Sequence, residues 1–144
     1  MQDRDTLYPF EVVLQGVPAS LQSKSAKNRE AWKERVAAAA RERQRESYEL
    51  GFLDDRPLAV SIYYFPSDPM TGDIDNIVKP IMDAMIGIAY LDDRVVERVT
   101  VQKFEPDVGW EFRTPSDRLA LALDVEPPVL YIRVDDDLVW RRVQ

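Results

Sequence analysis

The segment from residue 74 to residue 88 has the periodicity that most limits how this chain can fold. Its apolar residues recur at intervals of four, four and three, at Ile77, Ile81, Met85 and Ile88. This spacing predicts an amphipathic helix with one side facing a core. Pro80 lacks a backbone donor, so we expect it to bend or tighten the first turn. Such a helix needs other elements to cover its apolar side.

Strand patterns occur on both sides of this helix. Residues 57–65 are predicted to form a strand, because large apolar or aromatic side chains occupy every second position. One side of this segment consists of Leu58, Val60, Ile62 and Tyr64. Further strands are predicted at residues 7–15, 95–104 and 129–134. Residues 25–50 are rich in strong helix formers and predict a long, charge-laced helix with one narrow apolar face.

The order of these elements is β-α-β-α-β, an insert, and a final β. The insert, residues 105–128, contains several helix and strand breakers and predicts a loop with a short helix around residues 116–123. This order predicts an α/β fold, a two-layer sandwich in which a small mixed β-sheet packs against two main helices. With 144 residues and neither a repeat nor a linker, residues 1–144 are expected to form a single domain.

The chain contains no cysteine and no histidine. Disulfides, thiolate zinc sites, His-ligated zinc enzymes and hydrolases with a Ser-His-Asp or Cys-His centre are therefore excluded. Any catalysis must come from carboxylates, Lys or Arg side chains, hydroxyls or a bound metal ion. No apolar run approaches the ~18 residues of a membrane span, and the N-terminus is polar and acidic. We therefore expect a cytoplasmic protein with no membrane partner.

The formal net charge is −7, which counts against a nucleic-acid substrate because phosphate binding normally uses a basic surface. The charge is uneven, however. Residues 24–46 contain eight basic and four acidic side chains, so their net charge is 8 − 4 = +4 and the rest of the chain carries −11. The candidate DNA-binding residues in this stretch are Lys24, Lys27, Arg29 and Lys33. The alternative is an exposed, charge-mixed helix face.

Carboxylates gather at both ends of the predicted 74–88 helix. Asp73 and Asp75 open it, and Asp92 and Asp93 follow it. Magnesium takes oxygen ligands and keeps several waters, so two or three protein carboxylates suffice to hold it. Helix capping is the ordinary alternative for the first pair, but a cap requires only one aspartate. For the second pair the alternative is a plain acidic turn. The combined pattern is typical of a metal-dependent phosphodiester enzyme.

Lys79 lies four residues after Asp75 and four before Asp83, so all three side chains can project to one side of a helix. A lysine beside a metal ion can bind the scissile phosphate or stabilise charge that grows in the transition state. The alternative is a solvated lysine paired with a neighbouring acid, an interaction worth only a few tenths of a kcal/mol.

Residues 73–93 contain a spaced motif: Asp-x-Asp-Asn-x-x-Lys at a helix start, then Asp-Ala, a Gly, and an Asp-Asp pair before a strand. In this chain the motif residues are Asp73, Asp75, Asn76, Lys79, Asp83, Ala84, Gly87, Asp92 and Asp93. The motif closely resembles that of the RusA family of Holliday junction resolvases. The resemblance extends over roughly residues 10–104, including Val17-Pro18-Ala19-Ser20 after the first strand.

The resemblance implies a small α/β homodimer that binds branched DNA and cleaves four-way junctions symmetrically, using Mg²⁺ or, in its place, Mn²⁺. It implies that the metal-binding carboxylates are Asp73, Asp75 and Asp93. With them, Lys79 would complete the catalytic set beside the scissile phosphate. It implies supporting roles for Asn76, Asp83 and Asp92.

Three other functions remain open on the sequence. One is a RusA-fold DNA-binding module with weak or no nuclease activity. Another is a nuclease that acts on other branched DNA, such as flaps or forks. The third is a structural protein with an acid-rich surface. The low isoelectric point, about 4.7, and Gly72 in place of a basic residue before Asp73 bear on DNA binding more than on metal chemistry.

Overall fold

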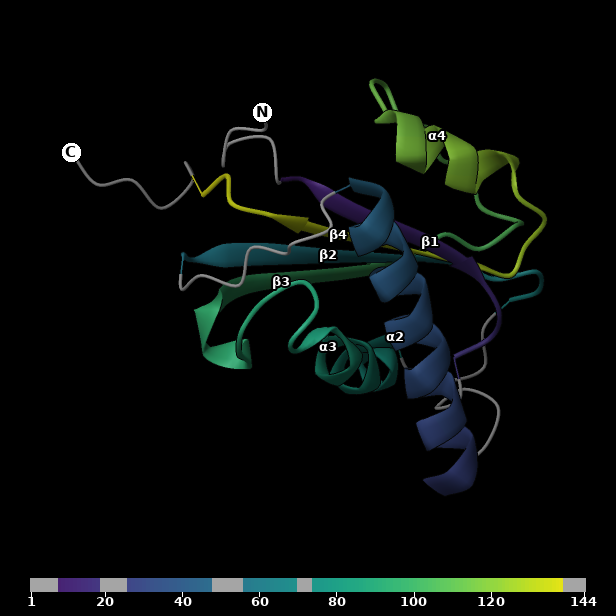
Figure 1. The fold of residues 1–144 in the computed structure, drawn as a ribbon. Helices are drawn as coiled ribbons and strands as arrows, with labels where there is room; N and C mark the ends of the chain where they lie inside the picture. The colour runs from purple at the N-terminus through teal and green to yellow at the C-terminus, as the bar shows by residue number, and fades with distance from the viewer. Residues whose placement is uncertain (1–7, 19–25, 48–55, 70–73, 139–144) are drawn as a thin grey trace.

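The computed structural model describes residues 8–18, 26–47, 56–69 and 74–138. A four-stranded mixed β-sheet lies at the centre of the protein (Figure 1). Across the sheet the strands are β1 (Phe10–Gln15), β4 (Val129–Asp135), β2 (Leu58–Phe65) and β3 (Val96–Lys103). Strand β4 is antiparallel to both β1 and β2, whereas β2 and β3 are parallel. The predicted small mixed sheet is confirmed.

Two helices, α2 (Ala26–Ser47) and α3 (Val78–Met85), cover one face of the sheet, and α4 (Asp117–Asp124) lies on the other (Figure 1). The main core lies between the sheet and the two helices. It includes the predicted apolar side of β2, of which every residue is at most 2 % exposed. The predicted α/β class with two main helices is therefore confirmed.

The second face of the sheet is also partly covered, by α4 and the insert before it. Tyr63 and Phe65 of β2 and Val129 and Tyr131 of β4 form a second apolar cluster with residues of α4 and of the insert before it. Because aromatic side chains point from both faces of these strands, a single helical layer leaves one face in water. The predicted short helix around residues 116–123 provides part of the missing cover.

The segment between β2 and β3 is the crossover that two parallel strands require. It starts with the 3₁₀ helix η2 (Ile74–Ile77), continues through α3, and ends with the 3₁₀ helix η3 (Asp93–Val95). The predicted apolar stripe is buried: Ile77, Ile81 and Met85 are at most 1 % exposed. The stripe thus faces the core as expected.

The continuous helix predicted over residues 74–88 is wrong at both ends. Its first turn is the 3₁₀ helix η2, which agrees with the tightening expected near Pro80, since the missing N–H would have bonded to the carbonyl of Asn76. Its last residues form a turn, because Gly87 adopts a positive φ of 81° that an α-helix cannot accommodate. The amide of Gly87 donates to the carbonyl of Tyr90 at 2.8 Å, which folds the chain back toward η3.

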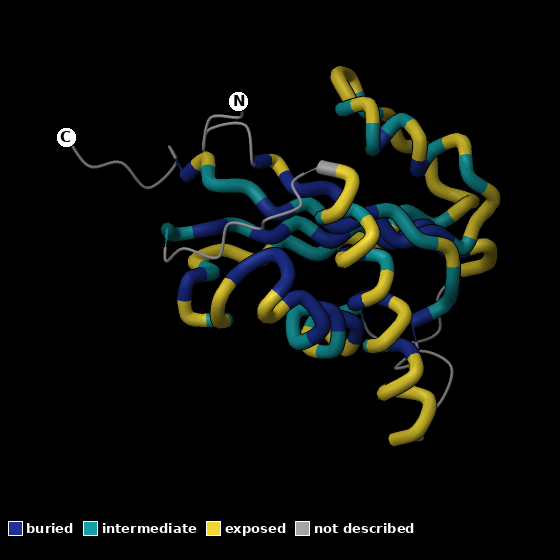
Figure 2. Tube along the Cα trace, in the orientation of Figure 1, coloured by how far each residue is buried: buried dark blue, intermediate teal, exposed yellow. Residues whose placement is uncertain are grey.

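Helix α2 packs its narrow apolar side, including Trp32, Val36 and Ala40, against α3 and β1. Ala37 is buried with them, whereas Ala39 is only half-buried. Residues 26–31, at the N-terminal end, are all exposed (Figure 2). None of the helices in the described part of the chain is long and apolar enough to cross a membrane.

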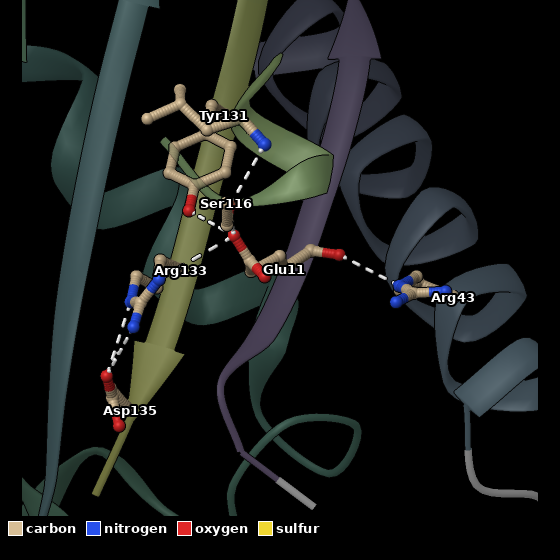
Figure 3. A network of polar contacts seen from close by, with 7 residues as sticks. Glu11, Arg43, Ser116, Tyr131, Arg133 and Asp135 are labelled. Carbon is tan, nitrogen blue, oxygen red and sulfur yellow. Dashed lines mark hydrogen bonds and ion pairs between the residues drawn. The ribbon is translucent and has the colours of Figure 1, made fainter. Parts of the chain in front are cut away.

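Glu11 of β1 is the buried charged residue of the described structure, at 6 % exposure (Figure 3). Its Oε2 accepts hydrogen bonds from the hydroxyls of Ser116 and Tyr131, and lies 3.7 Å from Nη1 of Arg133. The backbone carbonyl of Glu11 accepts a bond from Nε of Arg43 on α2. A buried carboxylate is tolerated only when it is bonded in this way. Since Ser116 also caps α4, this network holds α4 to the sheet.

Candidate active site between α3 and η3

The crossover brings three of the predicted site residues together. Nζ of Lys79, on α3, donates to Oδ1 of Asp83 one turn later at 2.9 Å. The same ammonium lies 4.0 Å from Oδ2 of Asp93, which belongs to η3. The turn through Gly87 therefore places the carboxylate that follows the helix beside the lysine on the helix.

Asp92 positions its neighbour rather than the lysine. It is the N-cap of η3, with extended backbone (φ −160°, ψ 152°), and its Oδ1 accepts a bond from the amide of Arg94 at 3.3 Å. Its carbonyl accepts a second bond, from the amide of Val95 at 3.2 Å, and Val95 is buried. This cap and anchor define the start of η3, and with it the direction of the Asp93 side chain.

The two oxygens of Asp93 lie in different surroundings. Oδ2 lies near Lys79, whereas Oδ1 is buried and has no hydrogen-bond partner in the described structure. An unsatisfied buried oxygen of this kind costs free energy, and native proteins usually provide it with a partner. A hard cation is a partner that a carboxylate oxygen accepts readily. The donor chemistry of Asp93 therefore fits a magnesium ligand.

Lys79 is poised for an anion. Its side chain is 77 % exposed, so the ammonium is accessible despite its ion pairs. The hydrogen bond to Asp83 and the charge of that carboxylate, with a smaller contribution from Asp93, raise the pKa of Lys79 above its ordinary value. The group is thus a permanent cation at neutral pH.

Tyr90 is a site residue that the sequence analysis missed. It is 1 % exposed, and its hydroxyl donates to the carbonyl of Met82 at 2.7 Å. Burial raises the pKa of this phenol, and the negative charges of Asp93 and Asp83 raise it further. A neutral Tyr90 ties α3 to the turn that leads to η3. Within an apolar run, this tyrosine carried no signal beyond that of a core residue.

Of the first acidic pair, Asp73 and Asp75, the structure describes only Asp75. Asp75 and Asn76 are exposed on η2, which packs against α3 and β3, whereas Asp73 lies outside the described residues. Asp75 forms no ion pair with Lys79 in the described structure. The predicted common side of Asp75, Lys79 and Asp83 therefore holds only for the last two, because a 3₁₀ helix has three residues per turn and leaves the α-helical stripe.

Three carboxylates close enough to hold a metal ion do not occur among the residues that the structure describes. The set expected from the sequence includes Asp73, so the described part contains two of its three members, Asp75 and Asp93. These two lie on η2 and η3, the two crossover elements that flank α3.

The expected basic surface on α2 is partly neutralised. Lys27 and Arg29 are exposed near the start of the helix, whereas Nζ of Lys33 lies 3.7 Å from a carboxylate oxygen of Glu30. Lys24 lies outside the described residues. Further along α2, two more ion pairs join Arg41 to Glu34 and Arg45 to Glu42. Three described basic residues of α2, Lys33, Arg41 and Arg45, are therefore paired with acids of the same helix.

The sequence matches a known protein family. A family model described as Endodeoxyribonuclease RusA matches residues 19–109, well over half of the chain. The match includes α2, β2, the whole crossover and β3, and it ends before α4. No curated protein matches the sequence. The matched region contains every residue considered above for metal binding, catalysis or DNA contact. Because the match covers well over half of its length, the chain belongs to the RusA family of endodeoxyribonucleases.

Proposed function

We propose that this protein is a Mg²⁺-dependent, structure-selective endonuclease that resolves four-way (Holliday) junctions by symmetric phosphodiester hydrolysis. The observation that carries the proposal is the pairing of Lys79 with Asp93, whose second oxygen is buried without a partner, inside the region matched by the RusA family. The exposed ammonium of Lys79 is suited to bind a phosphate, and the unsatisfied oxygen of Asp93 is suited to bind a metal ion.

The metal ligands in this proposal are Asp73, Asp75 and Asp93, with Mn²⁺ as a possible substitute for Mg²⁺. The unpaired Oδ1 supports Asp93 as one of the three metal ligands, since a bound cation would remove the free-energy cost of leaving that oxygen unpaired. A bound Mg²⁺ supplies an activated water and neutralises charge on the phosphate. Asp92 holds η3, and thereby Asp93, in place.

Lys79 is the proposed phosphate-binding residue. Its exposed ammonium is held over α3 by Asp83, which fixes its direction without burying it. A positive charge placed in advance near the scissile phosphate stabilises the charge that develops during hydrolysis. Asn76, exposed on η2, supports the same region.

DNA contact is assigned to the N-terminal end of α2 and the residues just before it. The proposed residues are Lys24, Lys27, Arg29 and Lys33. Helix α2 packs against α3, so this basic end and the candidate active site belong to one side of the sheet. A homodimer would place two such sites on opposed strands, since a two-fold axis matches the pseudo-symmetry of a four-way junction.

The test is cleavage of a labelled synthetic four-way junction beside a linear duplex of matched sequence. The reactions contain Mg²⁺, Mn²⁺ or EDTA, at low salt because the surface is acidic. We expect paired symmetric nicks on the junction alone, lost in EDTA and in Asp93→Asn. As a matched control, Asp117→Asn changes a carboxylate on α4, across the sheet from the site, and should cleave like the parent.

Other outcomes identify the alternatives. Junction binding without cleavage in either metal would contradict the nuclease and favour a DNA-binding module. Cleavage of flaps or forks in preference to the junction would keep the metal chemistry and replace the substrate. Equal cleavage by Asp93→Asn and the parent would refute the proposed site.

A further inference from the structure

Arg94 is a cation beside the candidate active site that has no role in the proposed chemistry. It is the second residue of η3 and follows Asp93 directly. Arg94 is exposed, and its guanidinium has no ion-pair partner among the described residues. Arg41, Arg45 and Arg133, by contrast, are each paired with an acid. The charge of Arg94 is therefore available to a ligand.

The backbone of Arg94 is held by the same cap that holds Asp93. Its amide donates to Oδ1 of Asp92 at 3.3 Å, and the next residue, Val95, is buried. A 3₁₀ helix has three residues per turn, so consecutive side chains leave it about 120° apart. Asp93 points toward Lys79 on α3. The side chain of Arg94 therefore leaves η3 in a different direction, away from the lysine.

Arg94 lines an open hollow of about 370 Å³. The described lining residues are Pro57, Arg94, Val95 and Glu97, so the hollow lies directly beside η3, where β2 and β3 begin. Two of these four residues carry a charge, and the charges have opposite signs. An anion in the hollow is attracted by Arg94 and repelled by Glu97, so the two residues should have opposite effects on its binding.

We propose that Arg94 binds the DNA phosphate next to the scissile one, on the same strand. This inference rests on the proposed function, in which Lys79 binds the scissile phosphate and Asp93 binds the metal ion. A DNA strand carries a continuous row of phosphates, so a strand bound at Lys79 can extend along η3 to Arg94. A guanidinium presents its donors in a planar fork that matches two phosphate oxygens. Arg94 is thus a substrate-binding residue in addition to those proposed above.

The role of this contact is to hold the strand in register with the carboxylates. Phosphate contacts fix the position and orientation of DNA on a protein. The phosphate at Arg94 does not react, so the contact is the same in the ground state and in the transition state. Such a contact strengthens binding and leaves the rate of the bound complex unchanged. Arg94 therefore affects affinity, whereas Lys79 affects the rate of cleavage.

The first test measures binding without cleavage. Fluorescence anisotropy of a labelled four-way junction in EDTA gives Kd at a series of KCl concentrations. Arg94→Ala should raise Kd about tenfold at low salt and reduce the slope of log Kd against log[KCl] by about 1, because one phosphate contact is lost. Arg94→Lys keeps the charge but loses the fork, so it should keep the slope while Kd rises only about threefold.

Arg113→Ala is the matched control for the loss of an exposed positive charge. Arg113 is exposed and also has no ion-pair partner in the described structure. It lies beside α4, on the face of the sheet opposite α3 (Figure 1). This variant should bind the junction with the Kd and the salt slope of the parent.

Glu97→Gln tests the hollow with the opposite sign. It removes the acid among the described lining residues and keeps the size of the side chain. The variant should bind the junction about threefold more tightly than the parent, because a carboxylate near the phosphate is lost. Equal or weaker binding would place the phosphate outside the hollow and contradict the inference.

The second test separates binding from chemistry. Single-turnover cleavage in Mg²⁺ over a range of protein concentrations gives the maximal rate and the half-saturating concentration. Arg94→Ala should raise the half-saturating concentration about tenfold and keep the maximal rate within about threefold of the parent, whereas Lys79→Ala should lower the maximal rate itself.

The outcomes keep the two proposals apart. The inference is overturned if Arg94→Ala matches the parent in Kd or in salt slope, or if Arg113→Ala weakens binding equally. Normal cleavage by such a parent would retain the proposed function and remove only Arg94 from it. A parent that binds the junction through Arg94 but never cleaves it would overturn the nuclease and keep Arg94 as a DNA contact. A parent that does not bind the junction would overturn both.

Discussion

The ammonium of Lys79 lies 4.0 Å from Oδ2 of Asp93, and the other oxygen of that carboxylate is buried with no hydrogen-bond partner. The two residues belong to different elements, α3 and η3, so their distance depends on the turn through Gly87 and on Tyr90, which ties that turn to α3. Substitutions of Lys79, Asp93 and Tyr90 are therefore expected to have three different effects.

Lys79→Ala should strongly reduce cleavage without affecting folding. Its ion pairs are exposed to solvent and screened, so the urea unfolding midpoint should match that of the parent. Junction cleavage should fall by about 100-fold or more, because the charge on the phosphate loses its stabilising cation. Single-turnover cleavage and urea melts check the two parts. Lys103→Ala, on β3, is the control, and a variant that cleaves normally would remove Lys79 from the site.

Asp93→Asn should remove the response to metal. Millimolar Mg²⁺ is expected to raise the melting temperature of the parent, because a ligand that binds only the folded state stabilises it. The variant should show no such shift, and without metal it should be as stable as the parent or more so, since the lone buried oxygen no longer carries charge. Differential scanning calorimetry with and without Mg²⁺ checks this. Asp117→Asn should keep the shift; an unchanged shift in Asp93→Asn would contradict the ligand assignment.

Tyr90→Phe should lower the free energy of unfolding by about 1–2 kcal/mol, because the half-buried carbonyl of Met82 loses the donor that the tyrosine provides. Urea titration of parent and variant measures this difference. Tyr63→Phe is the matched control, since the Tyr63 hydroxyl makes no hydrogen bond within the described structure, and its stability should change by less than about 0.5 kcal/mol. Equal effects of the two substitutions would show that the bond to Met82 contributes nothing.

Stability should decline between about pH 10 and pH 12. Burial raises the pKa of Tyr64 to about 12, and burial together with the hydrogen bond to Glu11 raises that of Tyr131 to about 12. Unfolded tyrosine titrates near pH 10. Above that pH the unfolded state therefore binds fewer protons than the folded state, and the free energy of unfolding falls until the folded tyrosines also ionise. Below pH 10 this contribution is fully present.

Urea titrations at several values between pH 9 and pH 12 check this decline. Tyr131→Phe should make the slope shallower across the window, because one of the groups with a raised pKa is gone. A stability that is flat from pH 9 to pH 12 would contradict the assignment.

Local patterns predicted the elements of the core and failed at their ends. The stripe of Ile77, Ile81 and Met85 faces the core as its spacing requires. The helix nevertheless stops at Met85, because the positive φ of Gly87 depends on a turn that closes through Tyr90. The spacing of apolar residues indicates which side of a segment faces the core. The residue at which a helix ends depends instead on hydrogen bonds to residues outside that spacing.

The buried role of Glu11 was not visible in the sequence for a similar reason. An acid between apolar residues of a strand normally faces solvent, and here its partners, Ser116 and Tyr131, are more than 100 residues away. Helix α4 was predicted as a short helix, but its place on the second face of the sheet depends on this network and on the aromatic residues beneath it.

By itself the sequence determined the chemistry available to this protein: no histidine or cysteine, acids on both sides of one amphipathic helix, and a lysine between them. It also determined the α/β class, because hydrophobic period and turn residues act over a few neighbouring positions. Only the tertiary structure decided that Lys79 meets Asp93 across the turn, that Oδ1 of Asp93 lacks a partner, and that an aromatic-lined cavity opens on the other face. These depend on distances between segments, which are set by packing of the whole chain rather than by any local pattern.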